Sequence, residues 1–108
     1  MLSATLPLAG ALSRYSAKRN LHHANFYCIA PKALDVMLVG DFNDWNSTAT
    51  PMRRMPDGRW MASLEIPHGY HQYLFLVDGV PTLDPRAAGT ARVDGFPEAA
   101  EASLIAVS

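Results

Sequence analysis

From residue 21 onward the sequence consists of short apolar runs separated by proline, glycine, aspartate and asparagine. Such alternation of strand-like and turn-like segments favours an all-β fold with short strands over a helical fold. One strand is expected at or after Pro51, before the turn described next. The other segments predicted as strands are residues 23–29, 34–40, 59–66, 70–77, 81–83 and 103–107.

The strongest turn signal is the string MPDGRW, residues 55–60. Its Asp57-Gly58 pair is expected to supply the two positive-φ positions of a tight hairpin turn. In the strand that follows, alternate residues point to opposite faces. The face predicted to meet the core carries Trp60, Ala62, Leu64 and Ile66.

The string YHQYLFLVDG, residues 70–79, is largely apolar on both of its faces. In a two-layer sandwich one face of such a strand meets the core, and the other face needs separate cover. That cover is expected from the N-terminal segment, from a partner or from a ligand. The second face carries Gln72, Leu74 and Leu76.

The chain of 108 residues has room for one domain with one modest core, and residues 21–108 are assigned to it. Residues 1–20 carry three basic and no acidic side chains and lack a strand pattern, so a helical or disordered tail is expected there. The apolar start of this tail is too short to span a bilayer and follows no basic residue, which favours a cytoplasmic protein.

Nine basic and ten acidic residues give a formal net charge of -1. Such a chain has no net field to attract nucleic acid or an anionic membrane, so neither is expected as a partner. Cys28 is the single cysteine and lies in an alternating segment, where it is predicted to be a small buried apolar residue. A disulfide within the chain is excluded.

No residue pattern indicates catalysis. Asp41 and Asp44 are three residues apart on a polar turn, where carboxylates are expected to accept backbone hydrogen bonds rather than form an acid–base pair. His22 and His23 are adjacent on a strand and point to opposite faces, so they cannot share a metal ion. A nucleophile elbow and a glycine-rich phosphate loop are both missing from the sequence. We therefore expect a non-catalytic protein with no metal and no cofactor.

The string DFNDWN, residues 41–46, places Trp45 in a polar turn. This indole either folds back over the end of the sandwich or presents a flat apolar face to a ligand. Sugar rings offer C–H patches that stack on aromatic faces, and their hydroxyls pair with amides and carboxylates. Asn43 and Asp44 are candidate partners for such hydroxyls. The residues alone leave both uses of Trp45 open.

Residues 36–85 resemble a known family. A strand ending in GDFNDW is followed, in order, by a proline-methionine stretch, DGRW, HGYHQYLFLVDG and LDP. This pattern is similar to carbohydrate-binding module family 48, the early-set domain of isoamylases and glycogen-branching enzymes and the glycogen-binding domain of the AMP-activated protein kinase beta subunit. With its flanking strands the resemblance covers residues 21–107. It implies an immunoglobulin-like antiparallel β-sandwich that binds α-1,4-linked glucans or docks beside a catalytic barrel.

The resemblance also implies roles for single residues. Trp45 matches the tryptophan that stacks on sugar in glucan-binding members. Pro81 stands where a second stacking tryptophan is usual, and Leu74 stands where a lysine often contacts sugar. Ala102-Ser103 replaces an asparagine that precedes the last strand. At about 1 kcal/mol for each lost contact, the three losses would lower the affinity roughly a hundredfold.

Two functions follow as hypotheses. The first is a non-catalytic glucan-binding or glucan-regulatory module, a weak binder, with Trp45, Asn43 and Asp44 at the sugar. A separately encoded carbohydrate enzyme is a further partner in this hypothesis. The second is a protein-interaction module or homodimer that has lost sugar binding. Its candidate interface consists of Gln72, Leu74, Leu76, Val80 and Pro81.

Overall fold

The computed structural model describes residues 21–93 and 96–108. Its strands form two sheets in which every pairing is antiparallel. One sheet has the order β1-β4-β3, and the other has the order β2-β5-β8-β7 with β6 also paired to β5. The elements are β1 (Leu21–Ile29), β2 (Val36–Gly40), the 3-10 helix η1 (Asp41–Asn43), β3 (Arg53–Arg54), β4 (Arg59–Pro67), β5 (Gly69–Val77), β6 (Val80–Thr82), β7 (Gly89–Arg92) and β8 (Glu101–Val107).

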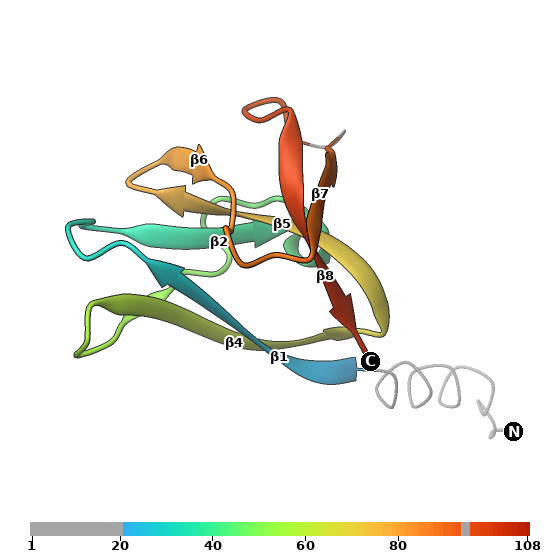
Figure 1. Ribbon diagram of the computed structural model, residues 1–108, viewed down its shortest axis with the longest axis horizontal. Coiled ribbons are helices and arrows are strands. Elements are labelled where there is room, and N and C mark those ends of the chain that lie inside the picture. The colour runs from blue at the N-terminus through green and yellow to red at the C-terminus, as the bar shows by residue number, and fades with distance from the viewer. Residues whose placement is uncertain (1–20, 94–95) are drawn as a thin grey trace, which may run out of the picture.

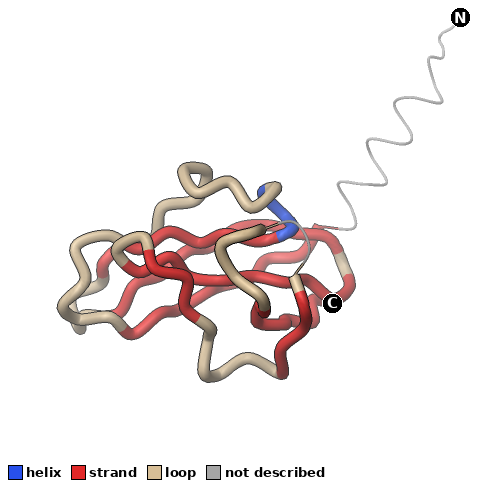
Figure 2. The backbone as a smooth tube through the Cα atoms, turned by 90° about the horizontal axis from the view of Figure 1, so that it is seen from above, coloured by secondary structure: helices blue, strands red, loops and turns tan. Residues whose placement is uncertain are grey.

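The two sheets pack face to face, with β1 and β4 in one layer and β2 and β5 in the other (Figure 1). Strands make up most of the described chain, and the loops gather at the ends of the layers (Figure 2). This arrangement confirms the predicted immunoglobulin-like antiparallel β-sandwich. No helix in the described part is long and apolar enough to cross a membrane. The predicted tail, residues 1–20, lies outside the described residues.

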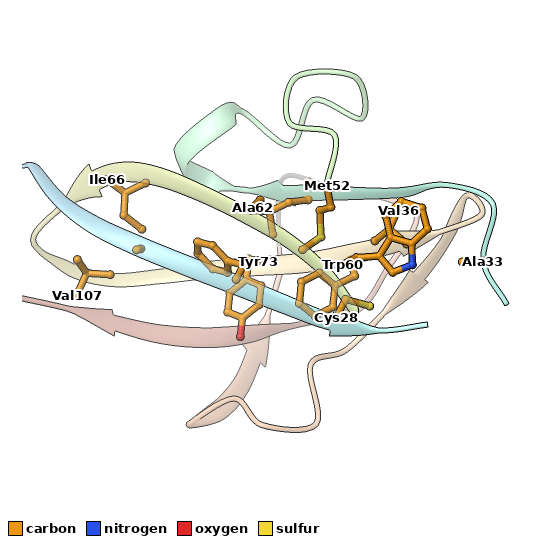
Figure 3. Packing of buried hydrophobic residues seen from close by; sticks show 13 residues of the cluster. Cys28, Ala33, Val36, Met52, Trp60, Ala62, Ile66, Tyr73 and Val107 are labelled. Atoms are coloured by element: carbon orange, nitrogen blue, oxygen red, sulfur yellow. The ribbon is translucent and has the colours of Figure 1, made fainter. Parts of the chain in front are cut away.

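The core between the sheets is built from alternate residues of β1, β2, β4 and β5, as the period of a strand requires (Figure 3). Leu38, Ile66 and Phe75 are among its most deeply buried side chains. Each such side chain contributes about 1.5–3 kcal/mol through removal of apolar surface from water. Trp60 also belongs to this core, and its indole N–H donates to the carbonyl of Ala30 at 2.9 Å. The predicted core face of residues 59–66 is confirmed.

All seven strands expected from the sequence are present, and β7 was not predicted. β7 has four residues, Gly89–Arg92, with intermediate and exposed positions and no buried ones. Its pairing with β8, from Gly89 opposite Leu104 to Arg92 opposite Glu101, defines it as a strand. A segment without buried apolar side chains carries no alternation for sequence reasoning to detect.

The predicted hairpin at MPDGRW joins β3 to β4, but its turn differs from the expected one. Gly58 has a φ of +89°, whereas Asp57 is not among the positive-φ residues. The Gly58 N–H donates to the Met55 carbonyl at 3.0 Å, and the Met55 N–H donates to the Arg59 carbonyl at 2.7 Å. Pro56 fixes its own φ near -65°, which suits the first central position of a type I turn. The result is a three-residue loop with one left-handed position rather than two.

The two-residue turn of the kind expected there occurs instead between β5 and β6. Asp78 and Gly79 have φ values of +49° and +84°. They join Val77 directly to its cross-strand partner Val80. The Asp78 carboxylate also accepts the backbone N–H groups of Leu34 and Asp35, both at 2.9 Å. This turn pairs β6 with the end of β5, from Phe75 opposite Thr82 to Val77 opposite Val80.

Candidate functional site

Both faces of β5 are buried, and the second face has its cover from an unexpected segment. Leu74 and Leu76 belong to an outer apolar cluster on the side of the sheet away from the main core. The cover comes from Val93, Phe96 and Ala99 of this same chain rather than from a partner or a ligand. We call this group the outer cluster; its buried members are Val39, Leu74, Leu76, Val93, Phe96 and Ala102.

Trp45 packs at the margin of the outer cluster. Its ring is stacked on Phe96, with centroids 5.6 Å apart and an interplanar angle of 20°. Phe96 itself is buried, whereas Trp45 keeps part of its surface exposed. The indole N–H of Trp45 has no hydrogen-bond partner among the described residues. Phe96 therefore supports one face of an indole that stays partly exposed.

The backbone that carries this indole is strained. Asp44 and Trp45 have φ values of +57° and +55°, two consecutive left-handed positions without glycine. A positive φ is unusual for any residue with a side chain and rare for a bulky one. Such strain costs about 1–3 kcal/mol per residue and persists only where the surroundings impose it. Strain of this kind clusters at ligand sites.

Asn43 is the residue that imposes the loop conformation. Its carboxamide oxygen accepts the Gly40 N–H at 3.0 Å. Its amide nitrogen donates to the Leu38 carbonyl and to Thr50 Oγ1, both at 3.0 Å. Both N–H groups of the side chain are therefore used within the protein. Asn43 holds the two ends of the Trp45 loop together rather than offering its amide to a ligand.

A second attachment joins the start of the loop to β5. Asp41 Oδ1 lies 2.8 Å from His71 Nδ1, and Asp41 Oδ2 accepts the Gln72 N–H at 3.0 Å. Gly40, the last residue of β2, lies close to the Phe42 ring and to the backbone of β5. A Cβ atom at this position would lie 2.6 Å from the Phe42 ring and 2.7 Å from the Gln72 carbonyl oxygen. Glycine is therefore required between β2 and η1.

Trp45 lines an open cleft of about 500 Å³. The cleft has apolar walls from the indole, Leu76 and Pro81, and polar groups from Asp44, Ser47 and Glu98. Flat apolar surface beside a few oxygen groups is the arrangement that binds a polyol ring. The residues that line the cleft are Asp44, Trp45, Ser47, Leu76, Gly79, Pro81, Phe96, Pro97 and Glu98.

The structure divides the residues that the sequence singled out for sugar binding. Trp45 and Asp44 line the cleft, and Asn43 lies behind it as a support. The Asp41 carboxylate accepts a backbone hydrogen bond, as expected, although from β5 rather than from its own turn. Asp41 and Asp44 therefore do not face each other across a cleft as a catalytic pair would.

The residues of the candidate protein interface do not form one surface. Leu74 and Leu76 are 1% and 7% exposed, which leaves little apolar surface for a partner. Gln72 is partly buried, and its amide donates to the Arg92 carbonyl at 3.3 Å. Val80 and Pro81 are neighbours on β6, so they point to opposite faces of that strand. Pro81 lines the cleft beside Trp45, and Val80 is 62% exposed.

Phe96 is a site residue that sequence reasoning missed. It lies between a glycine and a proline, between the segments predicted as strands at residues 81–83 and 103–107. The sequence contained one indirect signal, because the apolar second face of residues 70–79 required a cover. An aromatic residue in the longest remaining loop was a candidate for that cover.

The polar groups inside the sandwich fix its loops. Tyr73 donates its O–H to Asp84 Oδ2 at 2.5 Å, and the Asp84 N–H donates to Ser103 Oγ at 2.8 Å. Burial and the neighbouring Asp84 carboxylate raise the pKa of Tyr73, so its phenol stays neutral. Burial also raises the pKa of Cys28, whose thiol is therefore unreactive. The described residues contain no group of three side chains able to hold a metal ion.

Comparison with known proteins gives relatives of two kinds. The chain is 34% identical over 64 residues to the 1,4-alpha-glucan branching enzyme of Deinococcus radiodurans, a match that covers 59% of this chain and 9% of the enzyme. It is 41% identical over 54 residues to the 1,4-alpha-glucan-branching enzyme of Dictyostelium discoideum, covering 43% of this chain and 8% of the enzyme. It is 45% identical over 51 residues to the 5'-AMP-activated protein kinase subunit beta-1 of Sus scrofa, covering 47% of this chain and 39% of that subunit.

The chain thus spans less than half of the length of each of these relatives, and less than a tenth of the two branching enzymes. The sequence pattern of carbohydrate-binding module 48, the isoamylase N-terminal domain family, matches residues 13–88 of this chain. With the β-sandwich and the Trp45 cleft in place, the chain belongs to the carbohydrate-binding module 48 family.

Proposed function

We propose that this protein is a non-catalytic module that binds α-1,4-linked glucan by stacking a glucose ring on Trp45. The observation that carries the proposal is a partly exposed indole, held on a strained loop beside an open cleft. Maintaining two left-handed non-glycine residues costs stability. A loop that needed only to connect β2 to β3 would gain nothing from that cost.

The surroundings of Trp45 suit a sugar better than an apolar ligand. A pyranose ring places C–H groups on a flat aromatic face and directs its hydroxyls toward the rim. Asp44 and Glu98 offer carboxylate acceptors, and Ser47 offers a hydroxyl that both donates and accepts. The family match and the names of the two branching enzymes, whose substrate is a 1,4-alpha-glucan, point to the same class of ligand.

The binding is expected to be weak, because the sequence has other residues at the positions of three sugar contacts that the family resemblance implies. Pro81 lines the cleft with a ring smaller than an indole. Leu74 is buried under residues 93–100 and cannot extend toward a ligand. Ala102 and Ser103 are fully buried. At about 1 kcal/mol for each contact, binding falls to roughly one hundredth of that of a module with all three.

The substitution at residue 74 has a compensating effect on the site. Leu74 packs in the outer cluster together with Phe96, the residue that supports the indole. A lysine there would place a charge inside this cluster. We infer that the chain has exchanged a direct sugar contact for a firmer support of Trp45.

The alternative hypothesis, an interaction module that uses the second face of β5, has less support. Its two main anchors, Leu74 and Leu76, are covered by the chain itself. Exposing them would require residues 93–100 to leave the sheet. We therefore favour the glucan module, working beside a separately encoded enzyme that acts on the same glucan.

The proposal is tested by titrating the ¹⁵N-labelled protein with maltoheptaose up to several millimolar. The two indole N–H signals provide an internal control, because Trp45 lies at the cleft and Trp60 donates to Ala30 inside the core. We expect the Trp45 signal to shift and saturate at millimolar sugar while the Trp60 signal stays in place. The variant Trp45→Ala should bind at least tenfold more weakly.

Cellohexaose, a β-linked glucan, serves as the matched control ligand for linkage. A Trp45 signal that does not move over the whole maltoheptaose titration would refute the proposal. Equal shifts with both oligosaccharides would retain a sugar site but contradict the α-1,4 assignment. A dimer in solution without sugar shifts would favour the interaction module instead.

A further inference from the structure

The edge of β1 is unpaired along its whole length in the described part of the chain. β1 pairs with β4 on one side, from Leu21 opposite Pro67 to Ile29 opposite Arg59. On its other side, its backbone makes no hydrogen bond to any described residue. Proteins usually shield long edges with charges, bulges or covering segments, because an open edge accepts another strand. Nine residues provide enough edge for strand addition by an extended peptide.

Two cavities lie beside this edge. The first has a volume of about 380 Å³ and is lined by residues 27–30 of the β1 segment together with residues 82–86. The second has a volume of about 400 Å³ and is lined by residues 25–27 and by residues 104–106 of β8. Asp84 and Arg86 line both. The strand β1 runs beside β8 at this opening of the sandwich (Figure 3). We call the two cavities together the side groove.

The side groove carries more exposed apolar surface than a sandwich edge needs. Tyr27 is 40% exposed, Ile29 is 67% exposed and Leu83 is 40% exposed, and all three line the first cavity. Alternate residues of an added strand would point into the groove, as the period of a strand requires. The two cavities would then accept two such side chains of an extended peptide.

The charged groups at the side groove are mainly basic. Arg59 and Arg86 line the first cavity, and Arg86 also lines the second. Arg86 has no ion pair among the described residues, while Arg59 is paired with the exposed Asp57 at 2.8 Å. The acid at the groove, Asp84, already accepts the Tyr73 hydroxyl. An occupant with acidic side chains would be the complementary one.

The charge of each possible occupant of the side groove distinguishes a segment of this chain or a second copy from a partner protein. Residues 1–20 contain Arg14, Lys18 and Arg19 and no acidic residue, so this segment would bring like charge to Arg86. The β1 strand of a second copy, LHHANFYCI, also carries no acidic residue. We propose that the side groove binds an extended acidic segment of a partner protein, with apolar side chains at alternate positions, which adds as a strand to β1.

This site is separate from the Trp45 cleft. On β6, Pro81 lines the Trp45 cleft, whereas its neighbour Thr82 lines the side groove. The two sites lie on different faces of that strand and share no lining residue. A partner bound at β1 therefore leaves the cleft open. The module could hold a partner protein and a glucan at the same time.

The test uses two synthetic ten-residue peptides with valine or isoleucine at alternate positions. One carries aspartate and glutamate at the other positions, and the other carries lysine. In spectra of the full ¹⁵N-labelled chain, we expect the acidic peptide to shift amides of residues 24–29 and 83–87. The Trp45 indole signal should not move, with or without maltoheptaose. Arg86→Glu should weaken binding about tenfold, whereas Arg53→Glu, an equal charge change on the exposed β3, should leave it unchanged.

Two N-methylated versions of the acidic peptide, each blocked at alternate amides, test strand addition itself. Only one set of amides faces β1 in an added strand, so one version should lose binding and the other should keep it. Equal binding of the acidic and basic peptides would overturn the proposal. So would shifts that map away from β1, retained binding of both methylated peptides, or a homodimer joined through β1 that excludes them. Because Trp45 takes no part in this site, a failure of glucan binding would not affect these results.

Discussion

The two tryptophans of this chain differ in burial: Trp60 is buried in the core, and Trp45 is partly exposed at a cleft. Trp60 is 6% exposed, donates its N–H to Ala30 at 2.9 Å, and has the Arg54 guanidinium 5.8 Å from its ring centroid. Trp45 is partly exposed, has strained backbone and retains a free N–H among the described residues. The Trp60 indole is buried and hydrogen-bonded in the core, whereas the Trp45 indole stays partly exposed beside the cleft.

The same contrast applies to the two apolar clusters on either face of β5. The main core lies between two sheets, and its residues come from regular strands whose pairing is fixed. The outer cluster lies between one sheet and the segment that contributes Val93, Phe96 and Ala99. We infer that the main core determines stability, whereas the outer cluster determines the position of Trp45. Three substitutions test this division.

The largest expected effect is on the main core. Phe75 is 1% exposed and lies in edge-to-face contact with Tyr73, at 5.8 Å between centroids. Phe75→Ala should lower the free energy of unfolding by about 3–5 kcal/mol, through lost apolar burial and the cavity it leaves. Chemical denaturation measures this change. Phe75→Leu, which keeps most of the volume, should cost well under half as much.

Phe75→Ala should leave maltoheptaose affinity unchanged in the fraction that remains folded. A loss of affinity in that fraction would show that the two faces of β5 are coupled. The division between a stability cluster and a site cluster would then be incorrect.

The intermediate effect is on the outer cluster. Phe96→Ala should lower the free energy of unfolding by only about 2 kcal/mol, because the loop above it can collapse onto the sheet. It should also weaken maltoheptaose binding severalfold, although Phe96 is buried and supports the indole from below. The ratio of lost affinity to lost stability should therefore be larger than for Phe75→Ala. Val93→Ala, a truncation of a buried aliphatic member of the same cluster, provides the matched control for loss of cluster packing.

These comparisons also show what the sequence could and could not predict. The main core follows from the alternation in residues 59–66, where a period of two gives the buried face directly. The second face of residues 70–79 indicated that a cover was needed, but not which segment supplies it. Residues 93–100 have no period, and their packing depends on contacts with residues far along the chain. Pattern reasoning is local and cannot find such contacts.

The role of Asn43 differs from its expected one for a related reason. The sequence shows an amide next to a tryptophan and predicts that both face the same ligand. The structure shows that η1 turns the Asn43 side chain inward, to Leu38 and Thr50, while Trp45 points toward the cleft. Residue type predicts which groups can bind a sugar hydroxyl. The direction of each side chain depends on two left-handed residues that carry no sequence signal of their own.

The smallest expected effect on stability is at Asn43. Asn43→Ala removes three hydrogen bonds and leaves the Leu38 carbonyl and Gly40 N–H without their partner, which should cost about 1–2 kcal/mol because solvent reaches the loop.

Asn46→Ala is the matched control: Asn46 accepts from Thr48 in the same loop but is exposed, so its loss should cost less than about 0.5 kcal/mol. If Asn43 acts only by holding the loop, Asn43→Ala should weaken sugar binding by lowering the population of the ordered loop, and hydrogen exchange at residues 44–46 should become faster. A direct sugar contact predicts instead a loss of affinity that does not depend on loop order, with unchanged hydrogen exchange at residues 44–46. Asn43 would then contact the sugar beside Trp45, and its assignment as a residue that only holds the loop would be wrong.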